Sequence, residues 1–167
     1  MYIPDNKTVE IINLLMEDGR MSCAEISRRV GGISERAVRY RIEKLVKEGI
    51  IEITAVANAA ALGLPVIADV FIEADLPDLL NIAETLAEYE NISYVGCSIG
   101  EMDVSVQIYA KDTQSVYQFV TEVIAKIPGV RKTKTAILPI ILKDTHHWRV
   151  PKKLINEISN NDAAGDE

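Results

Sequence analysis

The sequence predicts an α+β chain with two modules: a helix-turn-helix, then a module with the βαββαβ order of a ferredoxin-like fold. Two observations predict this. Residues 22–48 hold two capped helical patterns separated by a glycine turn, and residues 65–142 alternate between strand-like and helix-like periods. A connector rich in small residues, 55–64, separates the two patterns. We therefore expect modules at 1–54 and 65–144, followed by a tail at 145–167.

The first module is expected to contain three helices and a short strand. The first helix is predicted over residues 5–18. The second follows Ser22, which forms a capping box with Glu25, and it stops at Gly31-Gly32. The third begins after Ser34 and ends near Glu48. The β-branched residues 50–54 then predict a short strand, the start of a wing, so this module is expected to be a winged helix-turn-helix.

The third helix is expected to turn a cationic face to solvent. Val38, Ile42 and Leu45 share one apolar stripe, and Arg41 lies near its edge, where a structural role is expected. From Arg28 to Lys47 there are seven basic and two acidic residues. A solvated surface helix is the alternative, but the two-helix arrangement favours binding in a DNA major groove. The residues expected at DNA are Arg28, Arg29, Ser34, Arg36, Arg39, Tyr40 and Lys44.

The second module alternates strands and helices. Helices are expected at 76–89 and 112–127, and strands at 65–73, 92–99, 103–110 and 130–142. Pro139 within the last strand favours an edge position or a bulge. Two helices cover one face of such a sheet, and the other face is expected to carry alternating apolar residues. A second copy of the chain is the simplest cover for that face, which predicts a homodimer.

Composition excludes several other classes of protein. The chain has 167 residues, 48% of them apolar, which excludes general disorder. It has neither an apolar run of membrane-spanning length nor a signal core at its N-terminus, so a cytoplasmic protein is expected. Cys23 and Cys97 are expected to be buried thiols. The net charge of −7 lies entirely in residues 55–167, because residues 1–54 hold nine basic and nine acidic side chains.

Eight short motifs carry a resemblance to a known family: Ile11-x-x-Leu14-Leu15, Asp18-Gly19-Arg20, Glu25-Ile26-Ser27, Val38-x-x-Arg41-Ile42-x-x-Leu45, Gly49-Ile50-Ile51, Gly100-Glu101-Met102-Asp103-Val104, Ile127-Pro128-Gly129-Val130 and Thr133-Lys134-Thr135. In these motifs the chain resembles the Lrp/AsnC family, the leucine-responsive or feast/famine regulators. The resemblance covers about residues 5–143. The first module departs from the family pattern in a turn that is one residue longer, and the second in having Glu101-Met102 where an aromatic often precedes the aspartate.

The resemblance implies a transcription regulator that binds double-stranded DNA. It also implies dimers formed through the second domain, often assembled into octamers, and an amino acid or related metabolite bound between dimers. The carboxylate of Asp103 suits an α-ammonium group, although it also suits the simpler role of accepting hydrogen bonds from turn N–H groups. The residues expected at this effector are Gly100, Met102, Asp103, Thr133 and Thr135. No cofactor and no metal are expected.

Two other functions stay open at this stage. Siroheme decarboxylases have a similar architecture, but the third helix of this chain keeps its arginines, which a chain freed from DNA would have little need of, and a non-enzyme is expected. A ligand-sensing protein that only modulates related regulators is the second alternative. In the tail, His146-His147-Trp148 favours a surface or packing role over a metal site. Leu154, Ile155 and Ile158 suggest one or two helical turns, and disorder is expected over 160–167.

Overall fold

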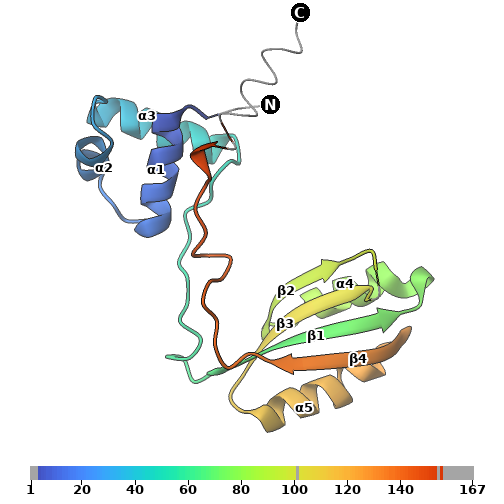
Figure 1. Cartoon of the computed structure of the whole chain (residues 1–167). Coiled ribbons are helices and arrows are strands. Elements are labelled where there is room, and N and C mark those ends of the chain that lie inside the picture. The colour runs from blue at the N-terminus through green and yellow to red at the C-terminus, as the bar shows by residue number, and fades with distance from the viewer. Residues whose placement is uncertain (1–3, 101, 154, 156–167) are drawn as a thin grey trace, which may run out of the picture. The chain divides into compact units, whose positions relative to one another are not determined.

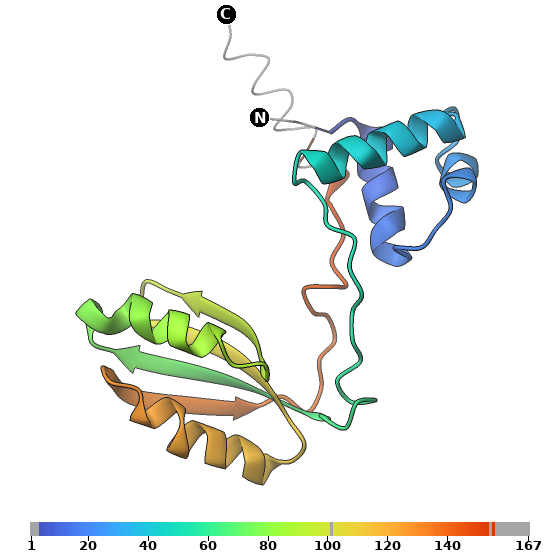
Figure 2. The same ribbon diagram turned by 180° about the vertical axis from the view of Figure 1, so that it is seen from behind.

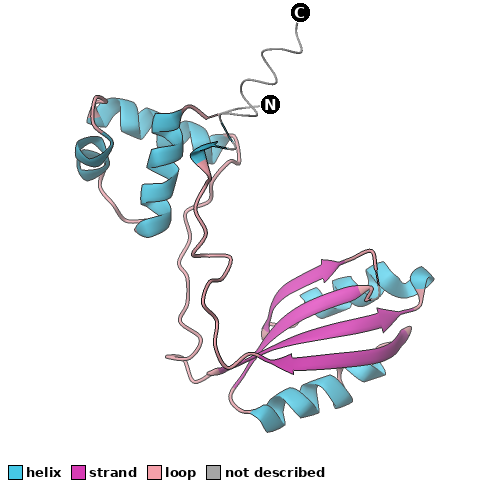
Figure 3. Cartoon of the chain, in the orientation of Figure 1, coloured by secondary structure: helices cyan, strands magenta, loops and turns pink. Residues whose placement is uncertain are grey.

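The computed structural model describes residues 4–100, 102–153 and 155. The chain divides into two compact units. One combines Met1–Val56 with Lys143–Glu167, and the other spans Ala57–Leu142. The first unit is helical and the second holds a four-stranded sheet with helices, as Figures 1 and 3 show. The predicted α+β fold with a helix-turn-helix followed by a ferredoxin-like module is confirmed.

The N-terminal unit is built from three helices: α1 (Asn6–Glu17), α2 (Cys23–Val30) and α3 (Glu35–Lys47). Each lies within about two residues of its predicted bounds, because a side-chain cap starts each one. Asp5, Ser22 and Ser34 accept hydrogen bonds from backbone N–H groups in the first turns. The apolar stripes of the three helices meet in one core cluster, whose buried members are Ile11, Leu14, Ile26 and Val38.

The second unit is a single antiparallel sheet with the strand order β2-β3-β1-β4. This is the ferredoxin-like order, and β4 lies at an edge, as Pro139 predicted. Short 3₁₀ turns precede α4 and follow α5. The elements are β1 (Val66–Ala74), α4 (Leu79–Ala87), β2 (Ile92–Cys97), β3 (Val104–Ala110), α5 (Thr113–Glu122) and β4 (Val130–Ile137).

Helices cover only one of the two faces of the sheet. Helices α4 and α5 pack on one face (Figure 2), where alternate residues of β3 are fully buried. We call the other face, which neither helix covers, the open face. It is less apolar than expected, since Asp69 accepts a 3.0 Å hydrogen bond from Gln107 and Glu73 pairs with Lys132. On β1 and β3 the open face consists of Ile67, Asp69, Phe71, Glu73, Ser105, Gln107 and Tyr109.

The strand predicted over residues 50–54 is absent from the structure. The reason lies at the end of α3, where Gly49 has a φ of 66°. This left-handed residue folds the chain back, so that the N–H groups of Ile50 and Ile51 both donate to the carbonyl of Leu45. Those N–H groups close the helix and are not available to a β ladder, so no strand forms there.

Three further expectations are corrected in the second unit. The last strand ends at Ile137, since the bond from the Leu138 N–H to Ile67 is followed by Pro139, which has no N–H. The helix expected to reach residue 89 ends at Ala87. Cys97 is exposed at the end of β2, whereas Cys23 is partly buried. The expectations for Leu154, Ile158 and residues 160–167 lie outside the described residues.

A polar contact ties α3 to the start of α1. The Arg41 guanidinium donates to Asp5 and to Thr8, and Thr8 is only 1% exposed. Asp5 is also the N-cap of α1, so one carboxylate serves both helices. This confirms the structural role expected for Arg41. Among the described helices, none combines the length and apolar character needed to span a membrane.

The contact between Asp5 and Arg41 predicts an acid-sensitive contribution to stability. The hydrogen bond from Arg41 lowers the pKa of Asp5 from 3.8 to about 2. A depressed folded-state pKa stabilises the protein fully above the unfolded pKa, and the effect is lost as pH falls through about 2. Because the Asp5 side chain is 58% exposed, solvent screening limits the gain to about 1 kcal/mol.

Comparing Asp5→Asn with the wild type by urea unfolding isolates this ion pair. Asparagine caps a helix about as well as aspartate, but it carries no charge for Arg41. We expect the variant to be less stable at pH 7, and the gap to close between pH 4 and pH 2. A gap that stays constant over this range would contradict the assignment. Asp5→Ala removes the cap as well and should cost about 1 kcal/mol more at every pH.

Candidate nucleic-acid interface and effector site

The turn between α2 and α3 positions the second helix of the motif. Gly31 and Gly32 both have positive φ, 68° and 61°, a conformation that other residues rarely adopt. Two left-handed glycines in sequence accommodate the extra residue of this turn. The hydroxyl of Ser27 donates to the carbonyl of Ile33 at 2.6 Å, and Ile33 packs against the core of the unit. The start of α3 is therefore held from both the polar and the apolar side.

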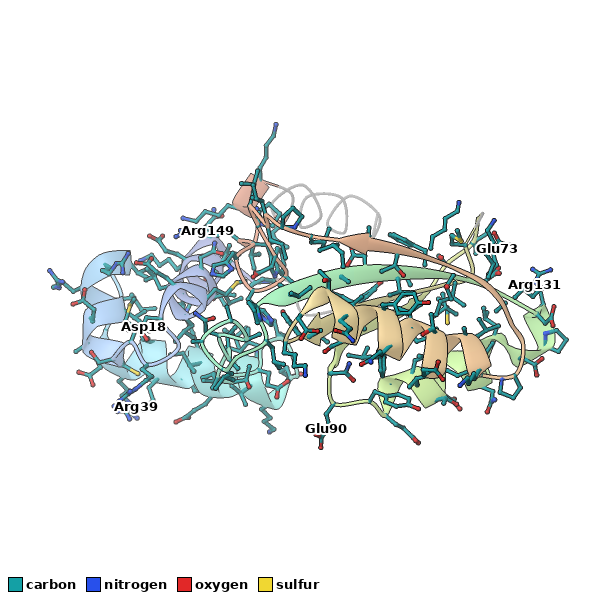
Figure 4. All side chains as sticks on the ribbon, turned by 90° about the horizontal axis from the view of Figure 1, so that it is seen from below. Asp18, Arg39, Glu73, Glu90, Arg131 and Arg149 are labelled. Atoms are coloured by element: carbon teal, nitrogen blue, oxygen red, sulfur yellow. The ribbon has the colours of Figure 1, made fainter. Side chains whose placement is uncertain are left out.

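Helix α3 buries one stripe and exposes the opposite one. Val38 and Leu45 are fully buried, whereas Arg36, Arg39 and Tyr40 are exposed. Tyr40 is a large aromatic with 66% of its surface exposed. Arg39 extends outward from the helix in Figure 4. The stripe that the sequence predicted to face solvent thus lies on the surface of the unit.

The predicted DNA residues differ in how they are held. The Arg36 guanidinium makes no hydrogen bond or ion pair within the described residues, whereas that of Arg39 pairs with Glu35 at 3.3 Å. On α2, the Arg28 guanidinium lies 2.6 Å from a Glu25 carboxylate oxygen. Ser34 uses its oxygen to cap α3 and keeps its O–H as a donor. Lys44 is half-buried on the flank of the helix.

Arg29 is tied to a different helix. Its two terminal nitrogens each donate to a Glu17 carboxylate oxygen on α1, both at 3.1 Å. These hydrogen bonds hold the pKa of Glu17 below its ordinary value. Because both side chains are partly exposed, solvent screens this ion pair, and a phosphate can replace the carboxylate at small cost. Arg28, Arg29 and Arg39 are therefore exchangeable cations rather than fixed parts of the fold.

The C-terminal segment contacts this unit, which sequence reasoning missed. The Asn13 side chain donates to the Val150 carbonyl at 3.1 Å and accepts from the Val150 N–H at 2.8 Å. A cavity of about 670 Å³ lies between the end of α1, residues 51–54 with Val56, and residues 145–149. No periodic signal in the sequence marks an extended segment that docks through its backbone.

The histidines of this segment make one notable contact. His147 Nδ1 lies 2.6 Å from the Asp144 carboxylate, and hydrogen bonding to His147 holds the pKa of Asp144 below its ordinary value. Within the part of the chain that the structure describes, no three His, Cys, Asp or Glu side chains are grouped closely enough to hold a metal ion.

The expected effector residues begin in the loop between β2 and β3. Gly100 has a φ of 152°, which favours glycine, and the hydroxyl of Ser98 donates to the Met102 carbonyl at 2.6 Å. Asp103 accepts a 2.8 Å hydrogen bond from the N–H of Ala74, a buried residue at the end of β1. One oxygen of this carboxylate thus has the structural role that the sequence left as the alternative. Residue 101 lies outside the described residues.

The two threonines lie on another strand. In the β1–β4 register, Thr133 is opposite Ile72 and Thr135 is opposite Val70, both of which are buried. Strand β1 separates β4 from β3, so the threonines stand about 10 Å from the strand that Asp103 precedes. The structure therefore does not place their hydroxyls beside Asp103 within one chain.

Comparisons with known families find a DNA-binding domain followed by a ligand-binding domain. A family model described as winged helix-turn-helix DNA-binding matches residues 4–52, and one described as Lrp/AsnC ligand binding domain matches residues 67–147. An uncharacterised HTH-type transcriptional regulator of Pyrococcus horikoshii is 36% identical over 149 residues, covering 84% of this chain and 94% of that protein. The regulator LrpA of Pyrococcus abyssi is 33% identical over 135 residues, covering 80% and 95%.

Solved structures agree in fold. AsnC of E. coli has a TM-score of 0.76 at 21% identity, covering 90% of this chain and 99% of its own. A transcriptional regulator of Neisseria meningitidis in complex with L-Met has a TM-score of 0.80 at 21% identity, covering 89% and 96%. At these identities the structural likeness establishes the fold alone.

The bond between Asp103 and Ala74 predicts a stability effect that needs no ligand. Asp103→Ala leaves the buried Ala74 N–H without its acceptor, which should cost about 1–3 kcal/mol. Asp103→Asn keeps an oxygen in place and should cost less. Urea unfolding of the full chain in ligand-free buffer measures both variants. An alanine variant as stable as the wild type would mean that this carboxylate does not support the end of β1.

Proposed function

Because the chain belongs to the Lrp/AsnC family of DNA-binding transcription regulators, we propose that it binds an operator through the exposed face of α3 and that a small metabolite controls this binding. It acts in the cytoplasm, where such a regulator meets its operator. The observation that carries the proposal is the exposed stripe of Arg36, Arg39 and Tyr40, held outward by the buried Val38 and Leu45.

The exposed stripe of α3 and the residues that flank it have different roles at DNA. Residues in the first half of a recognition helix reach base edges, so Arg36 and Arg39 read sequence or bind phosphate there. Tyr40, one position on, adds a phosphate contact through its hydroxyl. Arg28, Arg29, Ser34 and Lys44 flank this stripe and suit phosphate oxygens, which fix the register of the helix without reading bases.

The effector is an amino acid or a chemically related metabolite. The match of residues 67–147 to the family ligand-binding domain supports this, as does the complex of the Neisseria meningitidis regulator with L-Met. We place the ligand at the loop that carries Gly100, Met102 and Asp103. Because Thr133 and Thr135 lie across β1 from this loop, they reach the same ligand only if another subunit supplies them. The ligand regulates by favouring one assembly or DNA-binding state.

The chain acts as a dimer, and dimers assemble further. The open face carries Ile67, Phe71 and Tyr109 between polar residues, and a second copy related by a twofold axis covers them. The hydrogen bond from Gln107 gives Asp69, at the centre of this face, a polar partner within the chain. The relatives are named transcription regulators, and no residue group of the described chain favours the decarboxylase alternative.

The function is tested by replacing the arginines of the exposed stripe. DNA selected from a random pool with the wild type serves as the probe. Arg36→Ala with Arg39→Ala should weaken binding by about 1–3 kcal/mol for each arginine that reads a base, and relax specificity there. An arginine that binds phosphate instead weakens all sequences alike and flattens the salt dependence. Lys111→Ala with Lys126→Ala removes the same charge from the second unit and should change little.

Effector binding is tested by thermal shift across the twenty amino acids. We expect at least one to raise the melting temperature of the wild type, and Asp103→Asn to reduce that shift. The asparagine variant is chosen because it best preserves the end of β1. A ligand that stabilises the wild type and the variant equally would move the site away from Asp103.

Dimerisation is tested by light scattering at micromolar concentration. The wild type should have at least twice the mass of one chain. Phe71→Arg on the open face should lower the mass, because it buries an unpaired charge at the interface, whereas Tyr117→Arg on the exposed side of α5 should not. A folded monomer of wild-type protein would refute this arrangement.

A further inference from the structure

One face of α1 contacts the extended C-terminal segment of the same chain through polar groups. The Asn13 amide makes two hydrogen bonds to the backbone of Val150, one to its N–H and one to its carbonyl. The amide thus imitates the edge of a neighbouring strand. Bonds of this kind recognise extended backbone whatever its side chains, so they hold the segment in an extended conformation at Val150.

Charge supplies the complementarity on either side of this contact. Glu10, Asn13 and Glu17 lie on one face of α1, spaced three and four residues apart. Glu10 pairs with Lys152 at 3.1 Å, and Glu17 lies 3.7 Å from Arg149. Pro151, between the two cations, restricts the segment before it docks and so reduces the entropy lost on docking. The face is acidic at both ends, and the segment is basic at both ends.

The segment has little apolar packing to hold it. Residues 145–149 are exposed, and the cavity of about 670 Å³ lies beneath them. Trp148 retains 47% of its surface exposed. Segments with few buried apolar contacts open at low free energy. Polar contacts therefore hold the segment in place, and it can leave without unfolding the three-helix core.

Docking of the segment affects Arg29, a residue expected at the DNA surface. The Glu17 oxygen that lies 3.7 Å from Arg149 also accepts the bond from Arg29 at 3.1 Å. A docked Arg149 is thus a second cation at the carboxylate that holds Arg29. It partly neutralises Glu17 and weakens the attraction that a DNA phosphate must overcome to take Arg29.

We propose that the α1 face of Glu10, Asn13 and Glu17 is a reversible docking site for residues 149–152 of the same chain, and that docking strengthens DNA binding by loosening Arg29 from Glu17. The second half of this statement rests on the proposed function. The first half, that the segment docks, does not. Two separate measurements therefore test them.

Docking is measured through Trp148, the single tryptophan of the chain. Asn13→Leu removes both bonds to Val150 in a side chain of similar volume. Acrylamide should quench Trp148 more strongly in this variant than in the wild type. Asn6→Leu, the same change at an exposed position of α1, should leave quenching unchanged, and circular dichroism verifies that α1 persists. Val150→Pro removes the N–H donor from the other partner and should reproduce the effect.

The link to DNA is measured with the selected operator at several salt concentrations. We expect Asn13→Leu and Arg149→Gln each to raise the dissociation constant about threefold to tenfold, the order expected for one weakened phosphate contact. Arg149→Gln should lose most of its effect in a Glu17→Gln background, where Arg29 is already released. That non-additivity is the signature of coupling through Glu17.

Four outcomes would overturn the proposal in distinguishable ways. Equal quenching in the wild type, Asn13→Leu and Val150→Pro means that the segment does not dock. Protection of Trp148 only at concentrations that produce dimers means that the partner's segment docks instead. Altered quenching with unchanged DNA affinity removes the regulatory half. A wild type that selects no DNA defeats the proposed function, and the quenching result still decides whether the segment docks.

Discussion

The position of α3 depends on one shared polar contact. Arg41 donates to Asp5 and Thr8 at the start of α1, while Val38 and Leu45 fill the core below. The apolar stripe sets which face of α3 is buried and therefore the outward direction of Arg36 and Arg39. The bonds from Arg41 add a directional contact that ties the middle of α3 to the N-cap of α1.

Side-chain patterns predicted the elements well where the signal was local. The caps Ser22 and Ser34 bond to N–H groups only three residues away, and the alternation of β3 is visible in seven consecutive residues. The failures arose where a backbone group had two possible partners. Residues 50–54 have strand-forming side chains, but the N–H groups of Ile50 and Ile51 close α3 instead. No local pattern reveals which of two such bonds forms.

The candidate sites were predictable to different degrees for the same reason. Exposure of the α3 arginines follows from helical period alone. The structural bond from Asp103 to Ala74 joins residues 29 apart, and the bonds between Asn13 and Val150 join residues 137 apart. Contacts of that separation depend on the whole topology. The same holds for Thr133 and Thr135, whose distance from Asp103 is set by the insertion of β1 between β3 and β4.

The chain passes between its two units twice, first after α3 and again after β4, because residues from 143 onward belong with the first unit. A single cut by a protease in the connector before β1 therefore separates the three helices covalently from the second unit, and only the contacts to the C-terminal segment then hold them to the rest of the chain. The N-terminal unit is also discontinuous in sequence, which affects any chimera. A graft that ends at Val56 leaves Asn13 without Val150, whereas a faithful exchange of DNA-binding units must carry the C-terminal segment with it.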